Sequence, residues 1–377
     1  MSKITVNVYS SAEQLDRKLW DSIVEQANGS AFYRKEWLKA YELGSPGRNQ
    51  AFHFVALFGE TPIGIMPVYL TQGCPRLFAH HSILIKDTPN LKEPMLLAHS
   101  FYSYYGGPLV TSHHDEVYEV LIDEIKTLAG QLHVQVFGFV NLRHEDTHLI
   151  EILTENGFAV KYISSSMYLP IRYHSMEEYL QSLPKKRRSE FKRLNKKSIT
   201  LGVSSEWLSA PYDINEVFRL TKSVFNQHGH IDSDLYPKRF LNSLINELEH
   251  YKKFLLIKSP SDELICFFLV LDDGKKLIPW IAGINYNVLQ TYEPYYYGYY
   301  WIINHAINNN YHEIDMGRGS YIFKRRLGFQ RRPLYLALAA THANDSDIVK
   351  KWVHDLSERT IHRHQESFPT TDRPHVL

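Results

Sequence analysis

The pattern of apolar and polar positions along the chain predicts a mixed α/β protein. Apolar runs at Phe52–Phe58 and Ile63–Leu70 flank a Gly-Glu-Thr-Pro turn, which is typical of a β-hairpin. Periodicity then predicts a helix, a strand and a second helix, at His114–Leu128, His133–Asn141 and Thr147–Asn156. Gly157 directly follows the second helix, where we expect it to form a left-handed cap.

The same order recurs in the second part of the chain. A hairpin formed by Leu264–Leu271 and Lys275–Gly283 turns at Asp-Asp-Gly, and a helix, a short strand and a last strand follow, at Tyr295–Asn309, His312–Met316 and Leu334–Ala340. Any two α/β domains share part of such an order. The pairs Gly157-Phe158 and Gly328-Phe329, at matching places, favour a duplicated unit.

The length of 377 residues predicts two domains of ordinary size. We expect a first domain at 1–165, a second at 166–345, and a C-terminal helix and tail at 346–377 that is frayed after about Leu356. The formal net charge of +1 gives the whole molecule no field toward nucleic acid or membrane.

Cysteine usage and hydropathy indicate a compartment. Cys74 and Cys266 are too few for a disulfide framework and fit a reducing environment. No signal peptide is visible, and no apolar run approaches the roughly 20 residues that span a bilayer. The expected location is the cytoplasm. The 13% aromatic content includes 25 Tyr, whose polar tips suit pockets for partly polar ligands.

A basic segment lies near the start of the second domain. Eight of the thirteen residues at 185–197 are Lys or Arg, and we expect an inserted basic helix. It could contact the phosphates of CoA, of a lipid-linked sugar or of a tRNA backbone. It could equally be a solvated face balanced by Glu177, Glu178 and Glu190. Only Phe191 interleaves with the charges, which argues against sequence-specific reading and against DNA as a partner.

The stretch from Trp280 to Phe329 resembles the second GNAT domain of Fem-type transferases and related peptidoglycan or exopolysaccharide acyltransferases. The resemblance is carried by Trp-Ile-Ala-Gly-Ile-Asn at 280–285, Ile-Asp-Met-Gly-Arg-Gly at 314–319 and Phe-Lys-Arg-Arg-Leu-Gly-Phe at 323–329, and the basic segment also fits. It implies tandem GNAT-like α/β domains, each a mixed twisted sheet flanked by helices. It also implies transfer of an acyl or aminoacyl group, with acyl-CoA or aminoacyl-tRNA as co-substrate and no permanently bound cofactor.

One departure concerns the donor. The sequence has no Gln/Arg-x-x-Gly-x-Gly/Ala loop, whose backbone N–H groups bind the CoA pyrophosphate in ordinary acetyl-CoA enzymes. Fem-type relatives generally lack this loop as well. The resemblance also implies a splayed strand in the second domain, with the donor cleft around Trp280, Ala282 and Gly283.

Direct acyl transfer requires the protein to hold the thioester or ester carbonyl in place and to offer a hydrogen-bond donor to the developing oxyanion. It must also keep the attacking group deprotonated. Lys324, expected in a loop before Gly328, could neutralise a phosphate, a carboxylate or the tetrahedral intermediate, or it could be a solvated surface lysine. Arg318 could bind an anion in bidentate fashion or pair with Asp315. Glycines at 317 and 319 let backbone approach a ligand closely.

Aromatic and histidine residues complete the candidate set. Tyr296 and Tyr297 begin a Tyr-rich helix and could contact the donor, and Tyr321 could contact the substrate. Tyr104 and Tyr105, in an aromatic glycine-rich loop of the first domain, are candidate acceptor contacts. His228 could be a general base, a loop residue without a role or, with His230, part of a metal site that lacks a third ligand. We therefore predict no metal.

The first hypothesis is an N-acyltransferase that moves an acyl group from an acyl-CoA-type donor to an amine of a small metabolite, amino acid or amino sugar. The second is a Fem-type aminoacyl-tRNA-dependent transferase, which the basic segment favours and the near-zero net charge disfavours. The third is a catalytically silent ligand-binding protein on the same fold, because no indispensable catalytic pair is visible.

Overall fold

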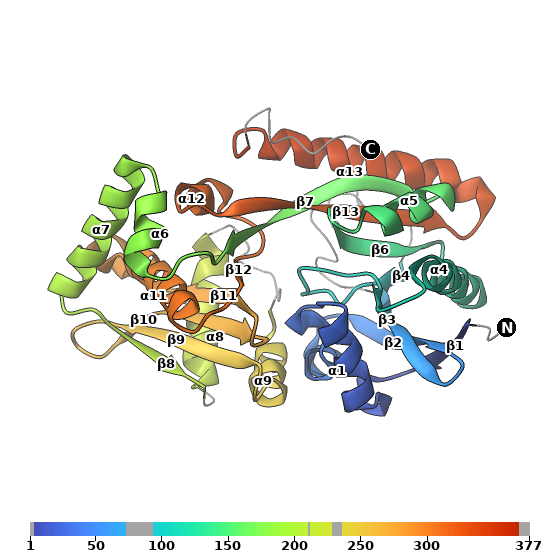
Figure 1. Ribbon diagram of the computed structural model, residues 1–377, viewed down its shortest axis with the longest axis horizontal. Helices are drawn as coiled ribbons and strands as arrows, with labels where there is room; N and C mark the ends of the chain where they lie inside the picture. The colour runs from blue at the N-terminus through green and yellow to red at the C-terminus, as the bar shows by residue number, and fades with distance from the viewer. Residues whose placement is uncertain (1–3, 73–92, 210–211, 228–235, 369–377) are drawn as a thin grey trace. The chain divides into compact units, whose positions relative to one another are not determined.

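The computed structural model describes residues 4–72, 93–209, 212–227 and 236–368. The chain forms two compact units, which Figure 1 shows as a ribbon. The first unit comprises Met1–Ser165, Asp234–Phe240 and Arg332–Leu377, and the second comprises Ser166–Ser233 and Leu241–Arg331. Each unit is a mixed α/β structure, as expected.

The sheet of the first unit has the strand order β1-β2-β3-β4-β6-β13-β7, with β5 paired to β3. Only β4 and β6 among its registered neighbours run parallel. The strands are β1 Ile4–Tyr9, β2 Arg48–Phe58, β3 Thr61–Gln72, β4 Met95–Ala98, β5 Leu109–Val110, β6 Val136–Arg143, β7 Ala159–Pro170 and β13 Gln330–Ala340. The helices are α1 Arg17–Gln26, α2 Lys35–Gly44, α4 His114–Gln131, α5 Thr147–Glu155 and α13 Ser346–His364.

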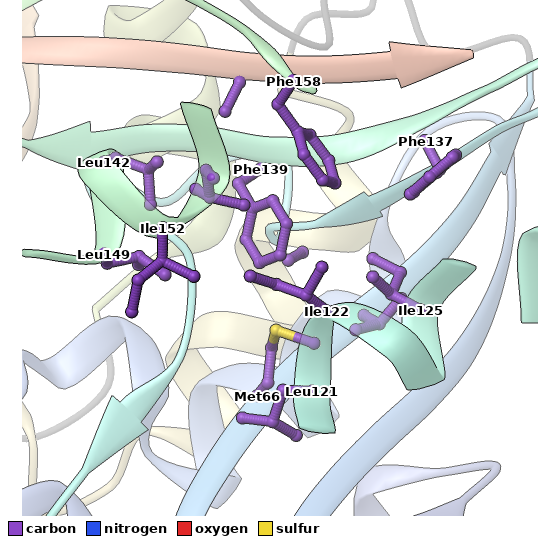
Figure 2. Packing of buried hydrophobic residues seen from close by; sticks show 14 of the residues in the cluster. Met66, Leu121, Ile122, Ile125, Phe137, Phe139, Leu142, Leu149, Ile152 and Phe158 are labelled. Atoms are coloured by element: carbon purple, nitrogen blue, oxygen red, sulfur yellow. The ribbon is translucent and has the colours of Figure 1, made fainter. Parts of the chain in front are cut away.

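A continuous apolar core holds the first unit together. Figure 2 shows Met66 of β3 and the α4 residues Leu121, Ile122 and Ile125 packed toward Phe139 of β6. These five side chains are at most 2% exposed. Burying each one stabilises the fold by about 1.5–3 kcal/mol, so α4 is held to the sheet by its apolar stripe.

The sheet of the second unit has the order β7-β12-β11-β10-β9-β8, and among its described neighbouring strands only β11 and β12 run parallel. Its further strands are β8 Ser204–Leu208, β9 Lys252–Lys258, β10 Leu264–Asp272, β11 Lys276–Ile284 and β12 Glu313–Asp315. The helices are α6 Met176–Ser182, α7 Lys185–Thr200, α8 Ile214–Gln227, α10 Leu289–Tyr292, α11 Pro294–Asn308 and α12 Tyr321–Arg326. Helix α9, Lys238–Glu247, contributes residues to both units.

The predicted repeat is present in the backbone. Gly157 and Gly328 each follow a helix with φ near +81°, and Phe158 and Phe329 each donate a backbone hydrogen bond to the residue five positions earlier. This is the Schellman arrangement that a left-handed glycine permits. The two halves therefore end a helix in the same way before a strand begins.

The strands after these two glycines are exchanged between the units. β7 follows Gly157 in the chain but pairs antiparallel with β12 of the second unit, whereas β13 follows Gly328 and pairs antiparallel with β6 of the first. The expected division placed β13 with the second domain. In the structure, β12, the parallel partner of β11, pairs with β7 from the first half of the chain. β6, the parallel partner of β4, pairs with β13 from the second half.

The C-terminal segment corrects a second expectation. The chain after Leu356 was expected to be frayed, but α13 continues to His364 with Leu356 and Thr360 buried. The Tyr162 hydroxyl and His364 Nδ1 lie 2.8 Å apart in a hydrogen bond. The apolar stripe and this contact hold the helix on the first unit.

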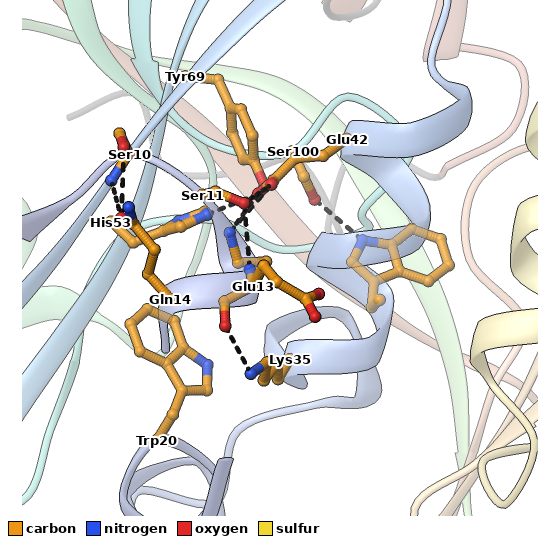
Figure 3. Close-up of polar contacts among 12 residues, drawn as sticks. Ser10, Ser11, Glu13, Gln14, Trp20, Lys35, Glu42, His53, Tyr69 and Ser100 are labelled. Carbon is orange, nitrogen blue, oxygen red and sulfur yellow. Dashed lines mark hydrogen bonds and ion pairs between the residues drawn. The ribbon is translucent and has the colours of Figure 1, made fainter. Parts of the chain in front are cut away.

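A partly buried carboxylate fixes the first turn of the chain to the sheet of the first unit (Figure 3). Glu42 of α2 accepts hydrogen bonds from the Ala12 backbone N–H at 2.9 Å, the Ser11 hydroxyl at 3.1 Å and the Tyr69 hydroxyl at 3.2 Å. His53 Nε2 lies 2.7 Å from the same carboxylate. Burial raises the pKa of Glu42, but the hydrogen bonds from its partners outweigh burial and hold the pKa below its ordinary value.

Replacing this carboxylate should destabilise the first unit. We expect Glu42→Gln to lower the free energy of unfolding by about 2 kcal/mol, because the amide cannot accept all of these hydrogen bonds. The pKa of Glu42 is lower in the folded protein than in the unfolded chain. The extra free energy of unfolding of wild type over Glu42→Gln should therefore persist above pH 4.5 and disappear as pH falls through the pKa of folded Glu42. Urea unfolding at several pH values measures this, with the exposed Glu60→Gln as a matched control. Equal losses for both variants would contradict the role of Glu42.

Candidate active site

Two parallel strands of the second unit diverge at their carboxyl ends. β11 and β12 pair through Lys276 with Glu313 and through Leu277 with Ile314. β12 then ends at Asp315, whereas β11 continues to Ile284 with its other edge paired to β10. Among the described residues, no strand pairs with the free edge of β11 beyond Leu277. We call this divergence, between 278–284 and the loop at 316–320, the β11–β12 fork. Sheets with parallel strands bind ligands at such carboxyl ends.

A β-bulge lies within the fork. Leu269 of β10 is opposite Ile281, and Val270 is opposite Pro279, so Trp280 is the extra residue of β11. Bulges twist a strand and redirect its side chains, and they are common beside active sites. Gly283 is required by packing, because an added Cβ would lie 2.1 Å from the Phe267 ring and 2.6 Å from the Leu220 Cβ.

The other side of the fork is a loop tied by buried polar contacts. Asp315 Oδ1 accepts a hydrogen bond of 2.6 Å from the Ser166 hydroxyl and one of 2.9 Å from the Gly317 N–H. Lys324 Nζ donates to the carbonyl oxygens of three successive residues, 316, 317 and 318, at 2.7, 3.2 and 3.1 Å. An ammonium has three donors, so each is used to hold the loop backbone.

Lys324 lies in helix α12 and is 4% exposed, so it is neither in a loop nor a solvated surface lysine. Counted back from the matching glycines, its position in the first unit is occupied by Leu153, a core residue with no exposed surface. Burial lowers the pKa of Lys324 to about 7, although the Asp315 carboxylate acts in the opposite direction. A buried lysine in place of a core leucine lowers the stability of the fold. Buried ionisable groups with shifted pKa values cluster at functional sites.

Arg318 has a different environment from Lys324. Its side chain is half-buried, and within the part of the chain that the structure describes its guanidinium forms no hydrogen bond or ion pair. The alternative pairing with Asp315 is wrong, because Asp315 accepts from Ser166 and Gly317 instead. Arg318 therefore keeps its five donors for an anionic group.

Aromatic rings of α11 and α12 pack together beside the fork. The ring centroid of Phe323 lies 4.9 Å from that of Tyr296, 5.0 Å from Tyr299 and 5.2 Å from Tyr295. Tyr296 remains half-exposed, and burial raises the pKa of its hydroxyl. Tyr297 is 4% exposed and donates to the Val203 carbonyl, so its ring belongs to the core.

The corresponding strands of the first unit also diverge, but their gap is filled. β4 and β6 pair as far as Ala98 and Phe139. Beyond them the Gly107 N–H donates to the Ala98 carbonyl, and the Gly106 N–H donates to the Asn141 carbonyl. A Cβ on Gly106 would lie 2.4 Å from the Val140 oxygen and 2.8 Å from the Ala98 oxygen. The backbone of this loop therefore occupies the space between the strands.

A family model described as FemAB-like, for peptidoglycan biosynthesis or recognition, matches residues 11–373. The chain belongs to the FemAB-like family. No curated protein sequence is similar to it at a significant level.

Solved structures agree with this family in fold. FemX is 12% identical with a TM-score of 0.61, and the match covers 86% of this chain and 96% of FemX. L-PGS from Bacillus licheniformis is 12% identical with a TM-score of 0.57, and the match covers 90% of this chain and 96% of L-PGS. A tandem GNAT protein from the clavulanic acid biosynthesis pathway is 10% identical with a TM-score of 0.55, and the match covers 90% of this chain and 99% of that protein. The expected tandem GNAT-like fold of this FemAB-like chain is confirmed.

Most of the predicted site residues of the FemAB-like chain lie in the second unit. The structure places them on β11, on α11, in the loop after β12 and on α12: Trp280, Ala282, Gly283, Tyr296, Tyr297, Arg318, Tyr321 and Lys324. Tyr321 begins α12 and is 9% exposed. His228 lies outside the described residues.

Tyr104 and Tyr105 lie in the first unit and are 8% and 7% exposed. The Tyr105 hydroxyl accepts a hydrogen bond of 3.0 Å from Arg332, which is also ion-paired with Glu145 at 2.9 Å. The Tyr104 ring packs 4.9 Å from Phe32. Both tyrosines are thus held by neighbours, and their part in acceptor binding stays a prediction.

Sequence reasoning missed Ser166, which fixes Asp315. It lies 149 residues away in the chain, and a serine in a run of three gives no local signal for this contact. Within the described residues, no helix is long and apolar enough to cross a membrane. The same residues include no group of three His, Cys, Asp or Glu side chains placed to hold a metal ion.

Filling the position of Gly106 should strain the first unit. We expect Gly106→Ala to lower the free energy of unfolding by about 1–3 kcal/mol, because the new methyl overlaps two backbone oxygens that cannot rotate away. Gly130→Ala, in α4 with no atom within 4 Å of its Cβ, is the control and should stabilise by up to about 1 kcal/mol. Denaturant unfolding measures both. Equal stability of the two variants would show that the gap is open.

The buried ammonium should make stability depend on pH. The folded pKa of Lys324 is about 7, below its ordinary 10.5, so between these values the unfolded chain binds a proton that the folded chain lacks. Wild-type stability should rise relative to Lys324→Leu by about 1 kcal/mol per pH unit from pH 7.5 upward. Urea unfolding of both proteins at pH 6.5–9 provides the comparison. A constant difference across this range would mean that Lys324 keeps its ordinary pKa.

Proposed function

We propose that this FemAB-like chain transfers an aminoacyl group from aminoacyl-tRNA to an amine, with the donor ester at the β11–β12 fork of the second unit. Family membership and the tandem GNAT fold support an acyltransferase-type function. The observation that carries the proposal is Lys324, buried where the other half has Leu153 and bonded to three carbonyls of the fork loop.

The chemistry is displacement at an ester carbonyl. The acceptor amine forms a C–N bond to the aminoacyl carbon, the carbonyl oxygen becomes an oxyanion, and the ester bond to the terminal ribose breaks. The ribose hydroxyl leaves with a proton, and the amine loses one. Backbone N–H groups on the free edge of β11 would stabilise the oxyanion. Lys324 would act as a positioning residue for the loop, and Arg318 would bind an anionic group of a substrate.

The start of α11 favours RNA over CoA as the donor carrier. In ordinary GNAT enzymes this helix start binds a pyrophosphate through free N–H groups. Here Pro294 has no N–H, and the Glu293 N–H donates to the Leu289 carbonyl. The Glu293 carboxylate, 3.5 Å from the Lys197 ammonium, adds negative charge where the pyrophosphate would lie. A phosphate cradle of the CoA type is therefore a poor match to this helix start.

The family description suggests the acceptor. A family described by peptidoglycan biosynthesis or recognition supports the free amine of a peptidoglycan precursor peptide as the acceptor. Tyr104 and Tyr105 of the first unit are the residues that we assign to acceptor binding. A small amino metabolite is the alternative acceptor.

The direct test is a transfer assay with two donors. The protein is incubated with bulk tRNA charged with tritiated amino acids, or with labelled acetyl-CoA, and a synthetic muropeptide that carries a free lysine amine. We expect ribonuclease-sensitive transfer of label from tRNA. Label transferred from acetyl-CoA alone would overturn the assignment of the donor and restore the acyl-CoA hypothesis. Absence of transfer from either donor would favour a silent binding protein.

Removing the unpaired guanidinium should weaken transfer without unfolding the protein. We expect Arg318→Ala to lower kcat/KM by about 10- to 100-fold, which is the loss of one or two charge-assisted hydrogen bonds. The melting temperature should change little, because Arg318 has no partner among the described residues. Arg172→Ala, an exposed arginine of the second unit without a described partner, is the control. Equal kinetics for both variants would remove Arg318 from the site.

A further inference from the structure

Helix α7 has a buried apolar face and an outward basic face. Phe191, Leu194, Asn195 and Ser198 are buried. The Phe191 ring lies 6.2 Å from the rings of both Tyr296 and Tyr300, so this face packs on α11. At 100° per residue, Lys185, Arg193 and Lys196 fall on the opposite side of the helix.

The outward face carries charge that the described protein does not neutralise. Lys185, Lys186, Arg193 and Lys196 are exposed and form no ion pair within the residues that the structure describes. Lys192, between them, is paired with Glu177 at 2.7 Å. From Lys185 to Lys196 the stripe is about 16 Å long. The predicted basic helix is therefore confirmed, and its balance by Glu177 and Glu190 is only partial, because these acids engage Lys192 and Arg187.

The C-terminal end of α7 is attached to α10, the short helix that precedes α11. The Ser198 hydroxyl donates to the Tyr292 carbonyl at 2.7 Å, and Lys197 Nζ donates to the Gln290 carbonyl at 2.6 Å. Tyr296, a half-exposed aromatic residue at the start of α11, lies in the electrostatic fields of Glu190 and Arg187 of α7 and of Arg326 and Glu293. A polyanion held on α7 would thus lie beside the proposed donor site.

We propose that the outward face of α7 binds the phosphodiester backbone of the donor RNA. This inference rests on the proposed function and assigns the surface that it requires. Phosphates repeat along an RNA strand and can cover a stripe of this length, whereas one pyrophosphate of CoA cannot. The face carries no aromatic ring for base stacking, so binding should be independent of base sequence.

A membrane surface fits this helix less well. Helices that lie in a bilayer interface insert a broad apolar face between the lipids. The apolar face of α7 is covered by α11, and Ile199, 55% exposed, is the one large exposed apolar residue within the helix. Attraction to anionic lipid would then depend on charge alone.

The test compares two triple variants of the full-length protein. Lys185, Arg193 and Lys196 are changed to Ala in one, and Lys18, Lys126 and Lys350 in the other. All six are exposed helical residues without a described partner, so both variants lose the same charge and should melt like wild type. Binding of deacylated bulk tRNA is measured from 50 to 200 mM salt, and binding to vesicles of equal phosphatidylglycerol and phosphatidylcholine is measured alongside.

We expect the α7 variant to bind tRNA at least tenfold more weakly at 100 mM salt. Its slope of log K against log salt should be shallower by about three, one for each lost phosphate contact. The control variant should bind as wild type does. Two outcomes would overturn this inference and leave the proposed function standing. In one, the α7 variant binds tRNA as tightly as wild type does. In the other, the α7 variant loses binding to the vesicles but not to tRNA. Absence of both tRNA binding and transfer from charged tRNA in wild type would overturn both.

Discussion

The candidate active site depends on one buried ammonium and the three carbonyl oxygens that surround it. Lys324 Nζ ties residues 316–318 into a fixed turn where β12 leaves β11. Burying this charge is costly, and the cost is offset only while all three acceptors stay in place. Because Asp315 holds the same loop from its other end, through Ser166 and Gly317, the backbone on this side of the fork has little freedom.

Duplication explains how such a site arose beside a half without one. Among the strand neighbours whose register the structure describes, each unit has one parallel pair with a divergence beyond it, and both halves end a helix with the same Gly-Phe cap. In the first unit Leu153 takes the position of Lys324, and the backbone of Gly106 and Gly107 fills the gap between the strands. The exchange of β7 and β13 means that neither unit completes its sheet from consecutive residues alone. The halves thus share an architecture and differ in chemistry.

Local patterns in the sequence predicted much of this structure, and long-range contacts account for most of what they missed. The hairpins, the cap at Gly157 and the helix at 185–197 follow from turn residues and periodicity over a few positions. The exchange of closing strands could not be predicted, because β13 has the same local pattern with either partner. β7 was not predicted, since Ser164, Ser165 and Ser166 interrupt its apolar pattern although all three are buried. For the candidate site, Lys324 was singled out through the family resemblance, but its burial was not foreseen, because its partners are main-chain oxygens that leave no mark on side-chain composition.

The central claim is that aminoacyl transfer takes place in the second unit because Lys324 holds the loop of its fork in place. The most direct measurement is the single-turnover rate of aminoacyl transfer from charged tRNA by Lys324→Leu, which gives this position the residue of the first unit. Leu153→Met, a conservative change at the matching core position, serves as the control. Our account predicts that both variants fold and that only Lys324→Leu loses transfer, by at least about a hundredfold, because the loop that Lys324 positions at the fork is then no longer held. A Lys324→Leu protein that transfers at the wild-type rate would contradict it.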